Sequence, residues 1–150
     1  MDQALALRIP PVVAWLGYGG LVPFAALAAV MAFDPAHARW WGEALVTYGA
    51  VILSFVGALH WGFAMSMSDL SGEERQRRFL WSVVPALLAW PAALLSVTPA
   101  VALLVAGFVA HYLCDRRLGV LSFLPRWYLP LRFRLTVVAC ASLIFAAMVA

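Results

Sequence analysis

The sequence predicts an all-α membrane protein: a single domain over residues 1–150, folded as a bundle of about five transmembrane helices. Of its 150 residues, 65% are hydrophobic and 11% are charged, whereas a soluble domain is roughly half apolar and about a quarter charged. The mean hydropathy is +0.93. Polar residues gather between apolar stretches, most of them long enough to cross a bilayer. The predicted helices span residues 12–33, 44–65, 79–97, 100–114 and 130–150.

The placement of arginine predicts the orientation of the bundle. All ten basic residues are arginines, and nine of them lie before the first span, after the second or after the fourth. Only Arg39 lies in another connection. Because cytoplasmic connections retain arginine during insertion, we expect a cytoplasmic N-terminus and a C-terminus outside. The nine are Arg8, Arg75, Arg77, Arg78, Arg116, Arg117, Arg126, Arg132 and Arg134.

The same composition bears on location and on partners. The net charge is +3, but membrane topology accounts for it, so we expect no nucleic-acid partner. Abundant alanine and arginine, with neither lysine nor asparagine, are typical of a GC-rich bacterial genome. We therefore predict a multi-pass protein of the bacterial inner (plasma) membrane. Its partners are the lipid bilayer and either other membrane proteins or further copies of itself.

The first span, residues 12–33, is long enough to cross the membrane. Its 22 residues extend over about 33 Å at 1.5 Å per residue, against a hydrocarbon core of about 30 Å. Three glycines and a proline predict an irregular first half. Asp34-Pro35 ends the helix, because a residue that precedes proline is pushed out of the α region. Residues 34–43 are expected to form a loop whose two tryptophans lie at the outer interface.

Two spans carry small residues at every fourth position. Such stripes allow backbones to approach closely, which drives helix packing where the hydrophobic effect is absent. They serve packing within the chain and between copies equally well. The stripes are Ala50, Ser54, Ala58 and Gly62 in the second span, and Ala102, Ala106, Ala110 and Cys114 in the fourth.

The connection over residues 66–78 is the most polar part of the chain. Ser71, followed by two glutamates and then three arginines, is typical of a short helix start. The third span, 79–97, contains two prolines, which predict a kink or a local break. Thr98-Pro99 predicts a tight return into the fourth span.

The fourth span, 100–114, is short and is expected to extend through Arg117. Residues 118–129 are apolar but broken by glycine and proline, which favours a segment lying along the inner interface. The last span, 130–150, covers about 31 Å only if its two arginines reach back to the headgroups.

Two histidines fall inside predicted spans, where an ionisable side chain is costly and points to function. His60 and His111 both lie near the cytoplasmic ends of their helices, at comparable depth. The favoured interpretation is structural: each imidazole bonds a tryptophan, a backbone carbonyl or a headgroup. The alternatives are paired ligation of a haem iron or another metal, and contact with protons or a small molecule. We predict no dedicated metal site and no bound cofactor.

Further polar and aromatic residues gather at the same predicted end. Asp115 is expected to form a structural ion pair with Arg132 or Arg134. The Arg126-Trp127-Tyr128 triplet is typical of an interfacial anchor, and it also suits an anionic headgroup or a quinone. The candidate ligand-binding residues are His60, Trp61, His111, Tyr112, Arg126, Trp127, Tyr128 and Arg132.

A set of motifs along the chain resembles a known family. These motifs lie at 16–24 (LGYGGLVPF), 48–50 (YGA), 53–55 (LSF), 57–62 (GALHWG), 82–85 (SVVP) with Trp90, and 125–128 (PRWY) leading to Leu131-Arg132 and Leu135-Thr136. Together they resemble the small polytopic membrane proteins grouped as a domain of unknown function, to which the animal transmembrane protein 69 belongs. The resemblance implies a bacterial inner-membrane protein with mitochondrial relatives, about five helices and no established activity. It directs attention to residues 48–62 and 127–132.

The function predicted from the residues is non-enzymatic. No nucleophile elbow, phosphate loop or metal-protease helix is present in the sequence. We predict a structural, assembly or accessory factor for membrane proteins. The alternative is a small-molecule binder for lipid, quinone or haem at an inner-leaflet site around His60 and His111. A third hypothesis, a minimal proton or solute conduit, requires a water path near Pro85 and Pro91.

Overall fold

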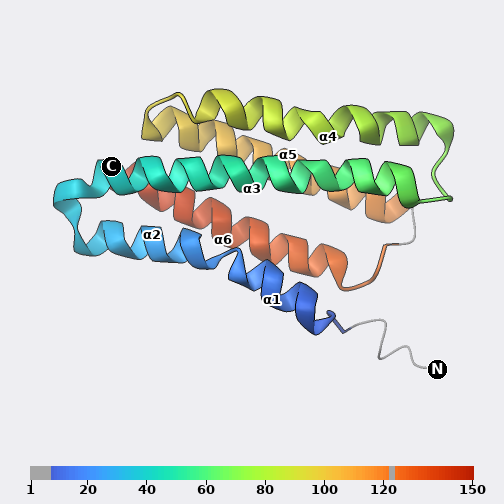
Figure 1. Cartoon of the computed structure of the whole chain (residues 1–150), viewed down its shortest axis with the longest axis horizontal. Coiled ribbons are helices and arrows are strands. Elements are labelled where there is room, and N and C mark those ends of the chain that lie inside the picture. The colour runs from blue at the N-terminus through green and yellow to red at the C-terminus, as the bar shows by residue number, and fades with distance from the viewer. Residues whose placement is uncertain (1–7, 122–123) are drawn as a thin grey trace.

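The computed structural model describes residues 8–121 and 124–150, and within them all the regular structure is helical (Figure 1). The long helices run antiparallel to their neighbours in the chain and form a bundle. The all-α prediction is therefore confirmed. The elements are α1 (Pro11–Gly19), α2 (Val22–Phe33), the 3₁₀ helix η2 (Pro35–His37), α3 (Ala38–Ser66), α4 (Gly72–Ala92), α5 (Val97–Leu121) and α6 (Tyr128–Val149).

Among the described residues, four helical segments are long and apolar enough to cross a membrane. They are Pro11–Phe33, Pro35–Ser66, Val97–Leu121 and Tyr128–Val149. Helix α4 is the remaining member of the bundle and packs along α3 and α5. Its first turns hold the charged residues of the polar connection, so its apolar part begins only at Phe79.

Both arginine-rich connections lie at the same end of the bundle as α1 (Figure 1). The C-terminus and the turn near Arg39 lie at the opposite end. The arginine-rich connections and the connection that holds Arg39 therefore lie at opposite ends of the bundle. Which end faces the cytoplasm stays a prediction from the arginine rule.

The predicted first helix, 12–33, is divided in two. Helix α1 ends at Gly19 and α2 begins at Val22. The Tyr48 hydroxyl donates a hydrogen bond of 2.9 Å to the Gly20 carbonyl at the break. A carbonyl released from helical bonding needs such a partner in an apolar setting. The irregularity predicted from the glycines is confirmed as this break.

The predicted loop 34–43 is wrong beyond its first residues. The η2 turn reverses the chain, and α3 begins at Ala38 rather than near residue 44. Asp34 stabilises the turn, because its carboxylate accepts hydrogen bonds from His37 Nδ1 (3.0 Å) and Trp41 Nε1 (3.1 Å). The bond from His37, followed by that from Trp41, holds the pKa of the Asp34 carboxyl below its ordinary value.

Helix α4 begins earlier and ends earlier than the predicted 79–97. The Ser71 side chain accepts a 3.2 Å hydrogen bond from the Glu74 backbone N–H, so it caps the helix as its sequence predicts. The charged turn and the apolar segment then form one helix that includes both prolines and ends at Ala92. The return follows immediately, and Thr98-Pro99 belongs instead to the first turn of α5, where proline is tolerated.

Helix α5 runs to Leu121, past the predicted boundary at residue 114 and one turn past the expected extension through Arg117. The predicted interfacial segment 118–129 is therefore wrong at both of its ends, since residues 118–121 belong to α5 and Tyr128 opens α6. Residues 122–123 of that segment lie outside the described residues. Asp115, Arg116 and Arg117 therefore lie on the same continuous helix as the apolar span.

The predicted small-residue stripes are only partly correct. In the second span Ala50 is buried, whereas Ala58 and Gly62 are exposed. A four-residue step rotates by about 40° relative to a 3.6-residue turn, so a long stripe leaves the packed face. The α3 glycines that meet other helices are Gly49 and Gly57 instead, together with Gly42. In α5, likewise, Ala102 and Ala106 are exposed.

Among the three α3 glycines, Gly57 makes the closest approach, and it joins α3 to α4. A side-chain carbon built on Gly57 would lie 2.8 Å from the Pro85 ring, closer than such atoms can pack. Pro85 itself is fully buried. This tight packing does not favour the water path near Pro85 that a conduit requires.

Candidate functional site

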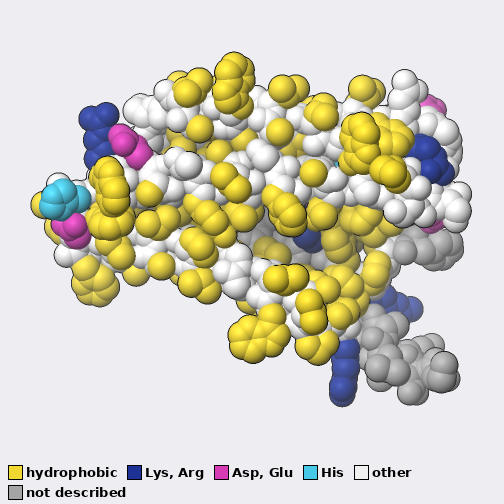
Figure 2. Space-filling view, viewed as in Figure 1, with side chains coloured by type: hydrophobic (Ala, Val, Ile, Leu, Met, Phe, Trp, Pro, Cys, Tyr) yellow, Lys and Arg dark blue, Asp and Glu magenta, His cyan; other side chains and the backbone are white. Residues whose placement is uncertain are grey.

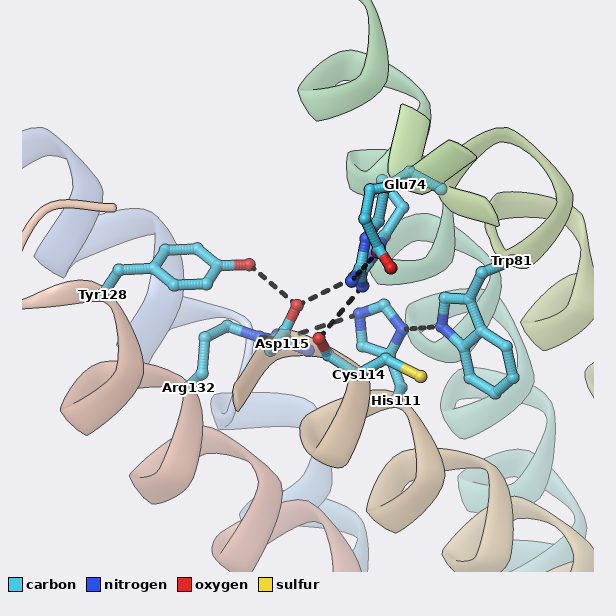
Figure 3. A network of polar contacts seen from close by, with 9 residues as sticks. Glu74, Trp81, His111, Cys114, Asp115, Tyr128 and Arg132 are labelled. Atoms are coloured by element: carbon cyan, nitrogen blue, oxygen red, sulfur yellow. Dashed lines mark hydrogen bonds and ion pairs between the residues drawn. The ribbon is translucent and has the colours of Figure 1, made fainter. Parts of the chain in front are cut away.

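A buried carboxylate on α5 joins three helices at the arginine-rich end (Figure 3). Asp115 is fully buried. Its Oδ1 atom lies 2.9 Å from His60 Nε2 on α3 and accepts a 3.3 Å hydrogen bond from the Tyr128 hydroxyl on α6. Its Oδ2 atom accepts a 2.9 Å hydrogen bond from Arg132 Nε, also on α6. We call Asp115 and these three partners, with His111, the Asp115 cluster.

His111 lies one helical turn before Asp115 and completes the cluster. Its Nε2 atom is 3.7 Å from Asp115 Oδ2, and its ring centroid is 4.9 Å from that of His60. On its other side, Trp81 Nε1 of α4 lies 3.2 Å from His111 Nδ1. Because an indole N–H only donates, His111 Nδ1 must accept, and the ring proton stands on Nε2 toward Asp115. Trp81 thus selects the neutral tautomer of His111.

The donor atoms of His60, His111 and Asp115 lie within 4.8 Å of one another, the spacing of a metal site. Their bonding argues against a cation there. Ligation through His111 Nε2 would move its proton to Nδ1, where it would face the Trp81 N–H. The Asp115 carboxylate is already paired with the Arg132 guanidinium, and the positive charge of that guanidinium would repel a metal ion. The chemistry therefore favours the structural interpretation, in which His111 bonds a tryptophan.

Three nitrogen atoms of the cluster are buried without a hydrogen-bond partner among the described residues: His60 Nδ1, His111 Nε2 and Arg132 Nη2. Burial of an unpaired polar group is unfavourable, so such groups mark strain or a binding function. Arg132 is only 6% exposed, so it does not reach back to the headgroups as the sequence predicted.

An apolar cavity of about 280 Å³ adjoins the cluster. It lies between the α1–α2 segment, α3 and α6, and α5 contributes Phe108. Tyr128 and Arg132 form its most polar wall, while Phe24, Val56 and their neighbours form the rest. Figure 2 shows the surface hollowed between α3 and the α1–α2 segment, with basic side-chain atoms at the floor of the hollow. The cavity is therefore open to the surroundings of the bundle.

Three predicted binding residues lie outside both the cluster and the cavity. Trp61 is half exposed and its ring packs against Phe79. Tyr112 lies on another face of α5, with its ring tilted against Phe133. Arg126 is exposed in the turn before α6. None of the three lines the cavity described above.

The other predicted residues divide between the cavity and the ion pair. Trp127 lines the cavity. The predicted pair of Asp115 with Arg132 is formed, but Arg134 has no part in it. Arg134 is exposed and its Nη1 atom donates a 3.2 Å hydrogen bond to the Tyr18 hydroxyl. Of the two arginines, only Arg132 faces Asp115 on α5.

Trp81, which bonds His111 of the cluster, is the residue that the sequence interpretation missed. The sequence does contain a signal for this contact. An indole N–H in a membrane span needs a hydrogen-bond acceptor, and a histidine in such a span was expected to need a hydrogen-bond partner. The cavity gave no such signal, since ordinary apolar residues from distant segments line it.

Replacement of Trp81 by Phe is expected to destabilise the protein by about 1–2 kcal/mol, because His111 Nδ1 loses its donor while remaining buried. Equilibrium unfolding in mixed micelles measures the effect. Trp90 is 70% exposed on the same helix, so Trp90→Phe is the matched control and should leave stability unchanged. Equal losses for the two variants would contradict a role for the indole N–H.

Comparison with known proteins assigns a family to the chain. The family model described as "Protein of unknown function (DUF3429)" matches residues 9–148. Transmembrane protein 69 of Xenopus tropicalis is 37% identical over 87% of the chain and 51% of its own length. Transmembrane protein 69 of Mus musculus is 27% identical over 92% of the chain and 56% of its own length.

The chain thus spans about half the length of these curated relatives. No solved structure matches it. The family match covers all the helices described above except the last residue of α6, and it includes the cavity and the Asp115 cluster. The resemblance stated from the motifs is confirmed. This chain belongs to the DUF3429 family of membrane proteins of unknown function, which includes transmembrane protein 69.

Proposed function

We propose that this protein binds a neutral lipophilic molecule with a carbonyl head group, of the quinone class, in the cavity beside Arg132. The observation that carries the proposal is the buried Arg132 Nη2 group, which has no hydrogen-bond partner among the described residues. Arg132 lines a cavity that is otherwise almost entirely apolar. A ligand oxygen at this wall would satisfy the N–H, and an apolar ring and tail would fill the remaining space.

Charge favours a neutral head group over an anion. Arg132 is already neutralised by Asp115, and the Trp81 bond keeps His111 neutral. An anionic head would therefore leave the buried cluster with a surplus negative charge, which is costly away from water. A carbonyl oxygen accepts the N–H without adding charge.

The shape of the cavity fits part of such a molecule. Ligand pockets commonly measure about 300–1,000 Å³, and this one measures about 280 Å³. A substituted ring and the first units of a tail would occupy it. The remainder of the tail would leave through the opening seen in Figure 2, toward the bilayer.

Haem is the least favoured of the ligand classes predicted from the sequence. His60 and His111 are fully buried and neither lines the cavity, so neither imidazole can reach an iron placed there. The structural, assembly or accessory role and the lack of enzymatic activity stay predictions, as does the location in the bacterial inner membrane.

A glycine pair on α1 tests the proposal. A side-chain carbon on Gly17 would lie 3.5 Å from Leu135 at the cavity wall, an ordinary contact, and Gly17→Leu is expected to fill the cavity. Gly19→Leu is the matched control, because its side chain meets nothing within 4 Å. With a decyl-benzoquinone as the probe, Gly17→Leu should weaken binding by about tenfold or more, a change of about 1.4 kcal/mol.

Binding is measured by calorimetry on the purified full chain in mild detergent. Gly19→Leu should bind the quinone as the wild type does. Decylbenzene, which lacks the carbonyls, should bind more weakly than the quinone by a similar factor. Unchanged quinone binding to Gly17→Leu would exclude the cavity as the site, and equal binding of decylbenzene would exclude recognition by Arg132.

A further inference from the structure

We propose a second binding site in a groove between α4 and α5, where the protein holds an anionic phospholipid. The groove measures about 460 Å³ and shares no lining residue with the cavity beside Arg132. One part of its wall is charged and consists of Glu74, Arg77, Arg78 and Arg117. The inference does not depend on the quinone proposal.

The charged wall has a surplus of positive charge, because it holds three arginines and one glutamate. The single Glu74 carboxylate pairs with both Arg77 (3.0 Å) and Arg78 (3.1 Å). Arg117 is exposed and forms no ion pair with any described residue. Arg77 has a further partner in Glu73, which lies outside the groove. The groove therefore lacks an anion opposite Arg117.

Arg78 places a largely buried guanidinium at the groove. Its side chain is only 6% exposed, and Nη1 donates to the Cys114 carbonyl at 3.2 Å, which ties α4 to α5. Its Nε–H group is buried without a hydrogen-bond partner among the described residues. A phosphate oxygen is a strong acceptor for such a group, and arginine is well suited to bind phosphate.

The rest of the groove is apolar, and most of it lies on α4. Leu80, Trp81, Val84 and Leu121 form it. On α4, Leu80, Trp81 and Val84 follow the arginines into the apolar part of the helix, whereas Leu121 lies beyond Arg117 at the end of α5. A basic rim above an apolar groove matches a phosphate head group above acyl chains, and basic pockets between transmembrane helices bind anionic lipids in this way. A free phosphate would leave the apolar part unused.

Two adjacent arginines provide the test. Arg116 and Arg117 are both exposed on α5, but only Arg117 lines the groove. The full chain in mild detergent is incubated with phosphatidylglycerol or phosphatidylcholine, and the retained lipid is measured by native mass spectrometry. Arg117→Gln is expected to reduce phosphatidylglycerol retention about fivefold. Arg116→Gln removes the same charge and should retain it as the wild type does.

Three results would overturn the proposal. Equal losses for Arg116→Gln and Arg117→Gln would show diffuse surface attraction. Equal retention of phosphatidylcholine by the wild type would show an apolar groove without head-group recognition. Displacement of the lipid by millimolar inorganic phosphate would show a simple anion site. Gly17→Leu, which tests the quinone cavity, should leave phosphatidylglycerol retention unchanged, so the two proposals can fail separately.

Discussion

Replacement of Asp115 by Ala is expected to lower the free energy of unfolding by about 3–5 kcal/mol, the largest effect we predict for a single substitution. Asp115 is the acceptor for His60, Tyr128 and Arg132, and it is fully buried. Its removal would leave the buried Arg132 guanidinium without a counter-charge. Breaking one half of a buried ion pair is much more harmful than removing both halves.

The double variant Asp115→Ala/Arg132→Met separates these contributions. Removal of both charges should recover most of the lost stability, because no uncompensated ion remains in the bundle. Equilibrium unfolding in mixed micelles measures both variants. Glu73→Ala is the surface control, since Glu73 pairs with Arg77 where both side chains are more than half exposed, and it should change stability by less than about 1 kcal/mol. A loss below about 1 kcal/mol for Asp115→Ala would contradict a dry, buried cluster.

Replacement of Gly57 by Leu is expected to destabilise the protein by about 3 kcal/mol, at the top of the usual range for overpacking. A side-chain carbon at this position would lie 2.8 Å from both Cβ and Cγ of Pro85. The proline ring cannot rotate away as a long side chain can, so α3 and α4 would have to separate. Those helices form the most extensive contact in the bundle.

Gly62→Leu on the same helix is the matched control for this prediction. No atom lies within 4 Å of a side-chain carbon built on Gly62. Leucine is a better helix former than glycine by close to 1 kcal/mol, so Gly62→Leu should leave stability unchanged or raise it slightly. Unfolding of the two variants under identical conditions gives the comparison. A Gly57→Leu variant as stable as Gly62→Leu would show that α3 and α4 can separate freely.

The sequence located the ends of the apolar segments better than it located the ends of the helices. Hydropathy reports which residues avoid water, whereas a helix continues for as long as its backbone bonds and caps permit. Helix α4 therefore starts at the Ser71 cap, inside the polar connection, and α5 continues past Asp115, Arg116 and Arg117 to Leu121. The predicted loop 34–43 was wrong for the same reason, since Asp34 stabilises a 3₁₀ turn that allows α3 to start at Ala38.

The candidate site was partly predictable. Equal depth in an antiparallel bundle placed His60 and His111 at one level, and the structure brings their rings to 4.9 Å. The ion pair of Asp115 with an arginine of the last helix followed from the need to compensate a buried charge. The choice of Arg132 over Arg134 did not follow. Two residues along a helix differ in direction by about 200°, and only the packing of α6 decides which one faces α5.

What the sequence determined by itself is the class of protein: a membrane bundle, the separation of nine arginines from one, and a polar cluster at the arginine-rich end. These follow from composition and from the order of segments along the chain. The tertiary structure decided which residues meet. Trp81 reaches His111 across 30 residues and Asp115 reaches His60 across 55. The rotation of each helix about its axis sets such contacts and the cavity beside them, and that rotation depends on all the neighbouring side chains together.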